Sequence, residues 1–336
     1  MEFYRERLWS SWSRTQVTMT DIPPAKAQLL GRTSDFDRGR TAAWIASLKH
    51  VSLTDDTRKH VSLTDDTRKH VSLTDDTCKH VSLTDDTRKH VSWRAVRDSI
   101  GHTIHVVSDR PFEELADDLR LGLRLMAWLS SRPVVWYWWD QPWARVLPAG
   151  VDPGPEHVNG GWAVVGIPEV HVYRREEAHK VLIHECIHAL GLDVPEAAIA
   201  PVRVKFETAL GRRLWPHLGE AFTEFFAEWL WCIVAPSLAT AKNRWTAQLR
   251  CAESQAAQVW VRIHDSLENE ETNVFAYYVL KWVLMGHTET VLLAPDTSVR
   301  LWYDWWLAAR PALEKLRRSA THTESLDLRL GMTCGL

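Results

Sequence analysis

The 336-residue sequence lacks any long, uninterrupted run of apolar residues. Its longest apolar segments, residues 221–236 and 273–285, contain glutamate or lysine and are too short to cross a lipid bilayer comfortably. The first residues, MEFYRERLWSSWSR, also lack the apolar core of a secretory signal peptide. These absences lead us to expect an intracellular protein that does not associate with membranes.

Cysteine is also scarce. The five cysteines are odd in number and irregularly spaced, which is not the pattern of a disulfide framework: Cys78, Cys186, Cys232, Cys251 and Cys334. A protein of a reducing compartment is therefore expected.

Neither sign of charge dominates the sequence. Lysine and arginine number 40 and aspartate and glutamate 43, so the formal net charge is −3 and gives no reason to expect nucleic-acid binding. The apolar fraction of 45% and the charged fraction of 25% are those of an ordinary globular protein. The 19 tryptophans are the one compositional excess, and such large side chains usually fill a core.

Residues 51–90 consist of four copies of the decapeptide VSLTDDTRKH, in which Cys78 replaces one arginine. Each copy offers one valine and one leucine for burial, which cannot offset the entropy of ordering ten residues. The alternative is a small stacked β array, although such arrays usually bury more per repeat. We expect residues 1–100 to be polar and largely disordered, residues 101–318 to form one globular domain, and residues 319–336 to form a polar tail.

The expected globular domain begins with strands and one helix. Residues 103–107 and 134–139 are rich in β-branched and aromatic side chains, which predicts strands. Between them, leucines at helical spacing predict a helix over about residues 109–130. Residues 162–165 and 169–173 predict two further short strands. The expected fold is α+β, with a small N-terminal mixed sheet, a backing helix and a mainly helical C-terminal subdomain.

The central motif is His184-Glu185-Cys186-Ile187-His188, an HExxH sequence within a predicted helix. Histidines at positions i and i+4 lie on one face of a helix, so both imidazoles can bind one ion. The glutamate beside the first histidine is the usual general base of a zinc hydrolase. We therefore predict that His184 and His188 bind Zn²⁺ and that Glu185 is catalytic. Cys186 should face away from the metal.

A catalytic zinc site needs a third protein ligand and an open position for water. The metzincin pattern requires His or Asp where this sequence has Val194, so that arrangement is disfavoured. Glu207 lies at the distance from the motif that is typical of zinc aminopeptidases, but its flanking residues differ from theirs. Glu220 begins a second candidate segment, LGEAFTEFFAEW, whose acidic and apolar residues fall on opposite helix faces.

Residues 218–229 resemble the third-ligand helix of gluzincins, in which the ligand glutamate is followed four residues later by an acid. This resemblance implies that Glu220 is the third ligand and that Glu224 holds the other N–H of a ligand histidine. Residues 159–191 and 271–281 also resemble uncharacterised gluzincin-like proteins of large DNA viruses. The resemblance implies a zincin-like fold and a bound Zn²⁺, and says little about the substrate.

Gluzincins place a tyrosine or histidine beyond the glutamate helix, where it donates a hydrogen bond to the developing oxyanion. The resemblance implies Tyr277 or Tyr278 in this role, with His287 as a weaker candidate. Residues 157–165 are our candidate for a strand that pairs with an extended substrate. We therefore expect a zinc metallopeptidase acting on a peptide or protein. The alternatives are an inactive zincin-fold binding module and a zinc amidase with a non-peptide substrate.

Overall fold

The computed structural model describes residues 2–22, 51–54, 80–83, 91–211, 218–263, 272–319 and 328–331. Most of the decapeptide repeat and most of the expected tail lie outside these ranges, so our expectations for them stay predictions. The chain divides into two compact units, which we describe separately. The sheet unit comprises residues 15–143 and 160–189, and the helical unit comprises residues 1–14, 144–159 and 190–336.

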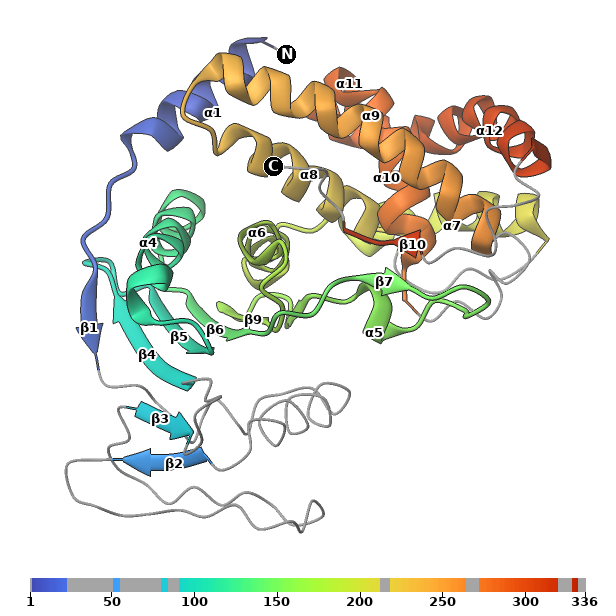
Figure 1. Cartoon of the computed structure of the whole chain (residues 1–336). Coiled ribbons are helices and arrows are strands. Elements are labelled where there is room, and N and C mark those ends of the chain that lie inside the picture. Colours follow the sequence, from blue (N-terminus) through green and yellow to red (C-terminus); the bar gives the residue numbers. More distant parts are fainter. Residues whose placement is uncertain are drawn as a thin grey trace. The chain divides into compact units, whose positions relative to one another are not determined.

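The sheet unit is built on a mixed sheet with the order β2-β3-β4-β5-β6-β9-β8, in which β1 also pairs with β4 (Figure 1). Its strands are β1 (Thr20–Ile22), β2 (Val51–Thr54), β3 (His80–Leu83), β4 (Val91–Arg97), β5 (Thr103–Ser108), β6 (Val135–Asp140), β8 (Gly161–Ala163) and β9 (Glu169–Val172). The strands β5, β6 and β9 run parallel, and β4 and β8 are antiparallel to their neighbours. The expected mixed sheet is thus confirmed.

The sheet extends further toward the N-terminus than we expected. We placed the start of the globular domain at residue 101, but β4 pairs along its length with β5 and also with β1. Ala95 and Val96 of β4 are buried, with exposed fractions of 2% and 0%. Strand β4 is stabilised by pairing with its neighbours β1 and β5. This pairing cannot be predicted from the amino-acid composition of the strand.

Two helices, α4 (Phe112–Leu129) and α6 (Ala178–Ala189), pack beside each other on one face of the sheet (Figure 1). The helix α4 buries Leu115, Leu119 and Leu123, as its helical spacing predicted. Gly122 allows this helix to approach the sheet closely, because a Cβ atom there would lie 2.3 Å from the ring of Trp136. The core of this unit is therefore a helix-on-sheet layer.

The helical unit confirms the expected, mainly helical C-terminal region. Its elements are α1 (Glu2–Arg14), β7 (Val146–Leu147), α5 (Pro155–Val158), α7 (Glu196–Leu210), α8 (Glu220–Ile233), α9 (Leu238–Ile263), the π-helix η2 (Phe275–Leu280), α10 (Lys281–Gly286), α11 (Thr288–Leu293), α12 (Pro295–Ser319) and β10 (Leu328–Arg329). Aromatic side chains fill its core, where Phe222 of α8 and Phe206 of α7 both lie edge-on to Trp302. The tryptophan excess therefore includes core residues, as expected.

The described cysteines differ in whether they form a disulfide bond. Cys186 and Cys232 are buried and are not disulfide-bonded, whereas Cys251 on α9 is disulfide-bonded. We did not expect this bond, because pairing depends on tertiary proximity and not on spacing in the sequence.

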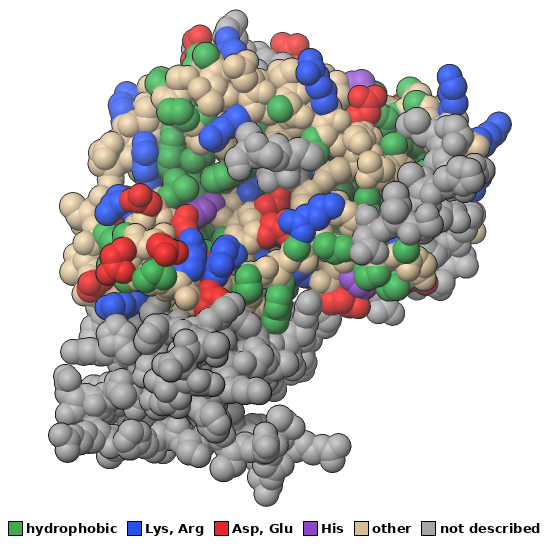
Figure 2. Space-filling model, in the orientation of Figure 1, with side chains coloured by type: hydrophobic (Ala, Val, Ile, Leu, Met, Phe, Trp, Pro, Cys, Tyr) green, Lys and Arg blue, Asp and Glu red, His purple; other side chains and the backbone are tan. Residues whose placement is uncertain are grey.

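The distribution of charged side chains on the surface agrees with the nearly equal numbers of acidic and basic residues. On the face seen in Figure 2, acidic and basic side chains are interspersed among scattered apolar ones. Within the described part of the chain, no helix is both long enough and apolar enough to cross a membrane.

Candidate metal centre

The HExxH motif lies on α6, a helix whose side chains are mostly buried. Leu182 and Ile183 are fully buried, whereas His184 and Glu185 each retain 6% exposure. The chain leaves the helix at Gly191, whose φ of +67° is left-handed and therefore favours glycine. The glycine thus allows the chain to turn out of the helix.

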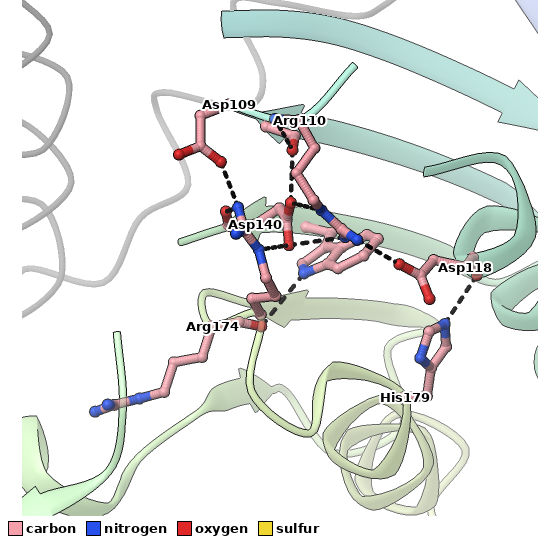
Figure 3. A network of polar contacts seen from close by, with 9 residues as sticks. Asp109, Arg110, Asp118, Asp140, Arg174 and His179 are labelled. Atoms are coloured by element: carbon pink, nitrogen blue, oxygen red, sulfur yellow. Dashed lines mark hydrogen bonds and ion pairs between the residues drawn. The ribbon is translucent and has the colours of Figure 1, made fainter. Parts of the chain in front are cut away.

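A network of charged side chains around Asp140 fixes the segment that leads into α6 (Figure 3). Asp140 ends β6 and is fully buried. It accepts hydrogen bonds from Arg110 (Nε to Oδ2, 2.7 Å), from Arg175 (Nε to Oδ1, 3.0 Å) and from the hydroxyl of Ser108 (2.5 Å). Arg175 also pairs with Asp109. These bonds connect the ends of β5 and β6 to the residues just before α6.

The electrostatics of this network favour its charged form. Burial lowers the pKa of the guanidinium groups of Arg110 and Arg175, but the hydrogen bonds and charge of Asp140 outweigh burial, and both pKa values are raised. In Figure 3, the Arg174 side chain extends away from Asp140, while its backbone carbonyl accepts a hydrogen bond from the Trp138 indole. We did not predict this network. An acid directly after a buried strand was its only sequence signal.

The two motif histidines are oriented as ligands of one ion. Their Nε2 atoms lie 3.1 Å apart, and their ring centroids lie 4.9 Å apart. Two imidazole nitrogens at ordinary zinc–nitrogen distances in a tetrahedral site would lie about 3.3 Å apart. The observed separation of the Nε2 atoms of His184 and His188 is close to that value.

Glu220 offers a third potential ligand atom. One ligand atom from each of His184, His188 and Glu220 can be chosen so that all three lie within 4.8 Å of one another, and this group could hold a metal ion. Glu220 lies in the first turn of α8. The other candidate, Glu207 on α7, belongs to no such group among the described residues. Two imidazole nitrogens and one carboxylate oxygen are a donor set typical of catalytic zinc, so the residues fit the expected ion.

Glu185 lies against β8 of the sheet unit. A Cβ atom at Gly161, the first residue of β8, would lie 3.0 Å from Cγ of Glu185 and 2.8 Å from Val181. Only a glycine allows the strand to approach α6 so closely. The expected catalytic glutamate is therefore adjacent to the outermost strand of the described sheet.

The edge strand is shorter than we expected. We expected it to span residues 157–165, but β8 comprises only Gly161–Ala163. His157 belongs to the short helix α5, and Val164 begins a turn closed by the N–H of Ile167, which donates to its carbonyl at 3.0 Å. Among the described strands, β8 pairs with β9 alone. Its outer edge is thus the end of the described sheet.

The two candidate tyrosines point to different partners. The hydroxyl of Tyr277 lies 3.4 Å from Oε2 of Glu220. The hydroxyl of Tyr278 is buried and donates to the backbone carbonyl of Leu330 at 2.6 Å. Both tyrosines lie on the π-helix η2, which follows Asn273 in a left-handed conformation (φ +56°). The structure therefore associates Tyr277, and not Tyr278, with the expected ligand.

His287 and Cys186 lie outside the ligand group. His287 is exposed and stacks on the ring of Trp305, with ring centroids 4.1 Å apart. Cys186 is 1% exposed and packs in the core, as its position on the helix predicted. Burial, with a further contribution from the charge of Glu185, raises the pKa of the Cys186 thiol, and Cys186 does not belong to the group of described residues that could hold a metal ion.

Glu224 contacts a lysine that we did not single out. Its Oε1 lies 3.5 Å from Nζ of Lys281, and Oε2 of Glu228 lies 3.6 Å from the same nitrogen. We expected Glu224 to hold a ligand histidine and did not predict Lys281 as its partner. The only available signal was a single lysine within an apolar helix.

Comparisons with protein-family models, with curated proteins and with solved structures gave no match. The functional interpretation therefore depends on the residues of the site.

Proposed function

We propose that the protein is a zinc-dependent metallopeptidase of the gluzincin type, with a zincin-like fold and with His184, His188 and Glu220 as the zinc ligands. The observation that carries this proposal is the approach of their ligand atoms to within 4.8 Å of one another. Three protein ligands leave one tetrahedral position open for water. Bound zinc would supply a Lewis acid that lowers the pKa of that water and polarises a carbonyl group.

Glu185 is the general base in this proposal. Its carboxylate follows His184 directly on α6 and retains slight exposure. A carboxylate in this position accepts the proton of the attacking water and then donates it to the leaving amine. This role requires only that the carboxylate reach the water, which its place beside a ligand histidine supports.

Tyr277 is the hydrogen-bond donor to the developing oxyanion. Its contact with Glu220 is long, at 3.4 Å, so the hydroxyl can turn toward a substrate carbonyl with little loss. Tyr278 is assigned no part, because its hydroxyl already donates to the carbonyl of Leu330.

The edge strand β8 favours a peptide as the substrate. An extended peptide can add to the outer edge of β8 through main-chain hydrogen bonds, next to Glu185. The turn after β8 also exposes three apolar side chains that would adjoin such a peptide: Val164, Val165 and Ile167. A small non-peptide amide would gain nothing from this edge, so we favour the peptidase over the amidase.

Zinc content and hydrolysis test the proposal. Elemental analysis should find one zinc per chain in the wild type and in the matched control Glu207→Ala, but little in Glu220→Ala. Glu185→Gln should retain zinc and lose about 10²-fold to 10⁴-fold in the cleavage of a peptide library. Retention of zinc by Glu220→Ala, or undiminished cleavage by Glu185→Gln, would contradict the assignment. Zinc binding without any turnover would indicate an inactive binding module.

A further inference from the structure

The last described residues of the chain, 328–331, form a short segment of the helical unit that we call the C-terminal strap. Its first two residues are the strand β10, which pairs with β7 (Figure 1). The carbonyl of Leu330 accepts a hydrogen bond from the hydroxyl of Tyr278 on η2 at 2.6 Å. The carbonyl of Gly331 accepts one from the side-chain amide of Gln255 on α9. The strap therefore contacts three elements of the helical unit.

The strap has little secondary structure of its own. A pairing of two residues on each strand is too short to be stable by itself, and chain ends fray unless other contacts fix them. Leu328 and Leu330 are nevertheless buried, with exposed fractions of 8% and 1%. The burial of the strap thus depends on contacts that fasten it to the rest of the unit.

One cysteine lies on α9 close to the contact between this helix and the strap. Cys251 is one helical turn before Gln255 and therefore on the same face of α9. It is buried and disulfide-bonded. Two of the other four cysteines form no disulfide bond. The partner of Cys251 is therefore Cys78 or Cys334, both of which lie outside the described residues.

The two possible partners differ in their connection to α9. Gly331 contacts Gln255, and the three residues from Gly331 to Cys334 can span about 10 Å. The rise along α9 from Gln255 back to Cys251 is about 6 Å. Cys334 can therefore reach the Cα separation that a disulfide requires. Cys78 belongs instead to the sheet unit and precedes β3, which pairs with β2 and β4.

We propose that Cys251 and Cys334 form a disulfide that locks the C-terminal strap onto α9, and that reduction of this bond releases the strap. When the bond forms, the two thiols lose two protons and two electrons to a low-molecular-weight disulfide such as glutathione disulfide, which becomes two thiols. A thiol reductant reverses this exchange. Because the bond joins residues far apart in the sequence, it restricts the unfolded chain, and its loss should lower stability.

Peptide mapping identifies the partner of Cys251 directly. Free thiols of the wild type, equilibrated with glutathione disulfide, would be alkylated before tryptic digestion without reduction. Cleavage after lysine and arginine places Cys251 in residues 251–262, Cys334 in residues 330–336 and Cys78 in residues 70–79. The first two peptides should be joined, and the third should be alkylated. A link between residues 251–262 and 70–79, or no link, would overturn the proposal.

Two variants test the assignment by titration of thiols in denaturant. With one disulfide among its five cysteines, the wild type should titrate three thiols. Cys334→Ser should titrate four, because every remaining cysteine is then unpaired. The matched control is Cys78→Arg, which restores the residue of the other three repeat copies and should titrate two. If Cys78 were the partner, the values of the two variants would be exchanged.

Stability tests whether the bond locks the strap. A phosphine reductant should lower the thermal midpoint of the wild type and of Cys78→Arg by about 5 °C or more, because it removes the cross-link. Cys334→Ser should begin at the lower midpoint and should not respond to reductant. The N–H of Leu330 donates to the carbonyl of Arg145 at 2.8 Å, and its hydrogen exchange should be about tenfold faster or more in Cys334→Ser.

A wild-type midpoint that does not respond to reductant, or unchanged exchange at Leu330 in Cys334→Ser, would overturn the locking role of the bond. If Cys334→Ser does not fold, the peptide map and the response of the wild type to reductant still decide the question. None of these measurements depends on zinc or on turnover, so their failure would leave the proposed function intact.

Discussion

The side chain of Glu185 occupies space next to Gly161, where an added Cβ atom would lie 3.0 Å from its Cγ. The same Cβ atom would lie 2.6 Å from the carbonyl oxygen of His171 on the neighbouring strand. The close approach of β8 to α6 therefore depends on one glycine, and it places the edge of the sheet beside the expected general base.

Gly161→Ala should lower peptide turnover at least tenfold, because β8 must move away from Glu185, and should cost about 1–3 kcal/mol of stability through overpacking. Zinc content should stay at the wild-type level. Gly286→Ala is the control, since no atom lies within 4 Å of its added Cβ and its φ is not left-handed. Steady-state kinetics and urea unfolding measure both effects. Equal turnover in the two variants would contradict the role given to Gly161.

The two adjacent tyrosines should separate catalysis from stability. Tyr277→Phe should lower kcat by about 10²-fold to 10³-fold with little change in KM, because an oxyanion donor acts mainly in the transition state. Tyr278→Phe leaves the buried carbonyl of Leu330 without this donor and should cost about 1–3 kcal/mol of stability while kcat is maintained. The reverse pattern would show that the assignments are exchanged.

Asp140→Asn should destabilise the protein by about 2 kcal/mol, because it removes the charge that faces Arg110 and Arg175 in a fully buried position. The two arginines are partly exposed, which keeps the cost below that of a completely buried pair. The control is Asp117→Asn, whose ion pair with Arg120 is exposed and should contribute less than about 0.5 kcal/mol. Urea unfolding compares the variants, and similar losses would argue against a special role for Asp140.

His105 should make the protein sensitive to acid. Burial, and then the charge of Arg97, lowers the pKa of His105 from 6.5 to about 4. The unfolded state therefore binds this proton more readily than the folded state. This difference in pKa contributes about 3 kcal/mol to the free energy of unfolding. The contribution is fully present above pH 6.5 and is lost as the pH falls through about 4.

The matched variant is His105→Phe, which keeps a ring to stack on Tyr137 and cannot titrate in this range. Its free energy of unfolding, measured in urea between pH 7.5 and pH 4, should fall less steeply than that of the wild type. Burial also lowers the pKa values of His102 and His179, so some of the acid sensitivity should persist. Identical slopes for variant and wild type would show that His105 does not carry this effect.

Local patterns were sufficient for the elements that use helical spacing. The positions of Leu115, Leu119 and Leu123 identified the buried face of α4, and the i,i+4 spacing of His184 and His188 placed both imidazoles on one side of α6. These predictions succeeded because a helix repeats every 3.6 residues whatever packs against it. Strand β4 was missed because its order comes from pairing with β5, a contact that its own residues do not encode.

The HExxH pattern alone was enough to identify the two histidines and the adjacent glutamate, and the rest of the sequence offered a short list of further candidates. Only the tertiary structure distinguished Glu220 from Glu207 and Tyr277 from Tyr278, and only it brought Lys281 to Glu224 and Glu228. The reason is physical. Residues within one helix are placed by its repeat, whereas partners more than 30 residues apart meet only when the core packs and its buried polar groups find their partners.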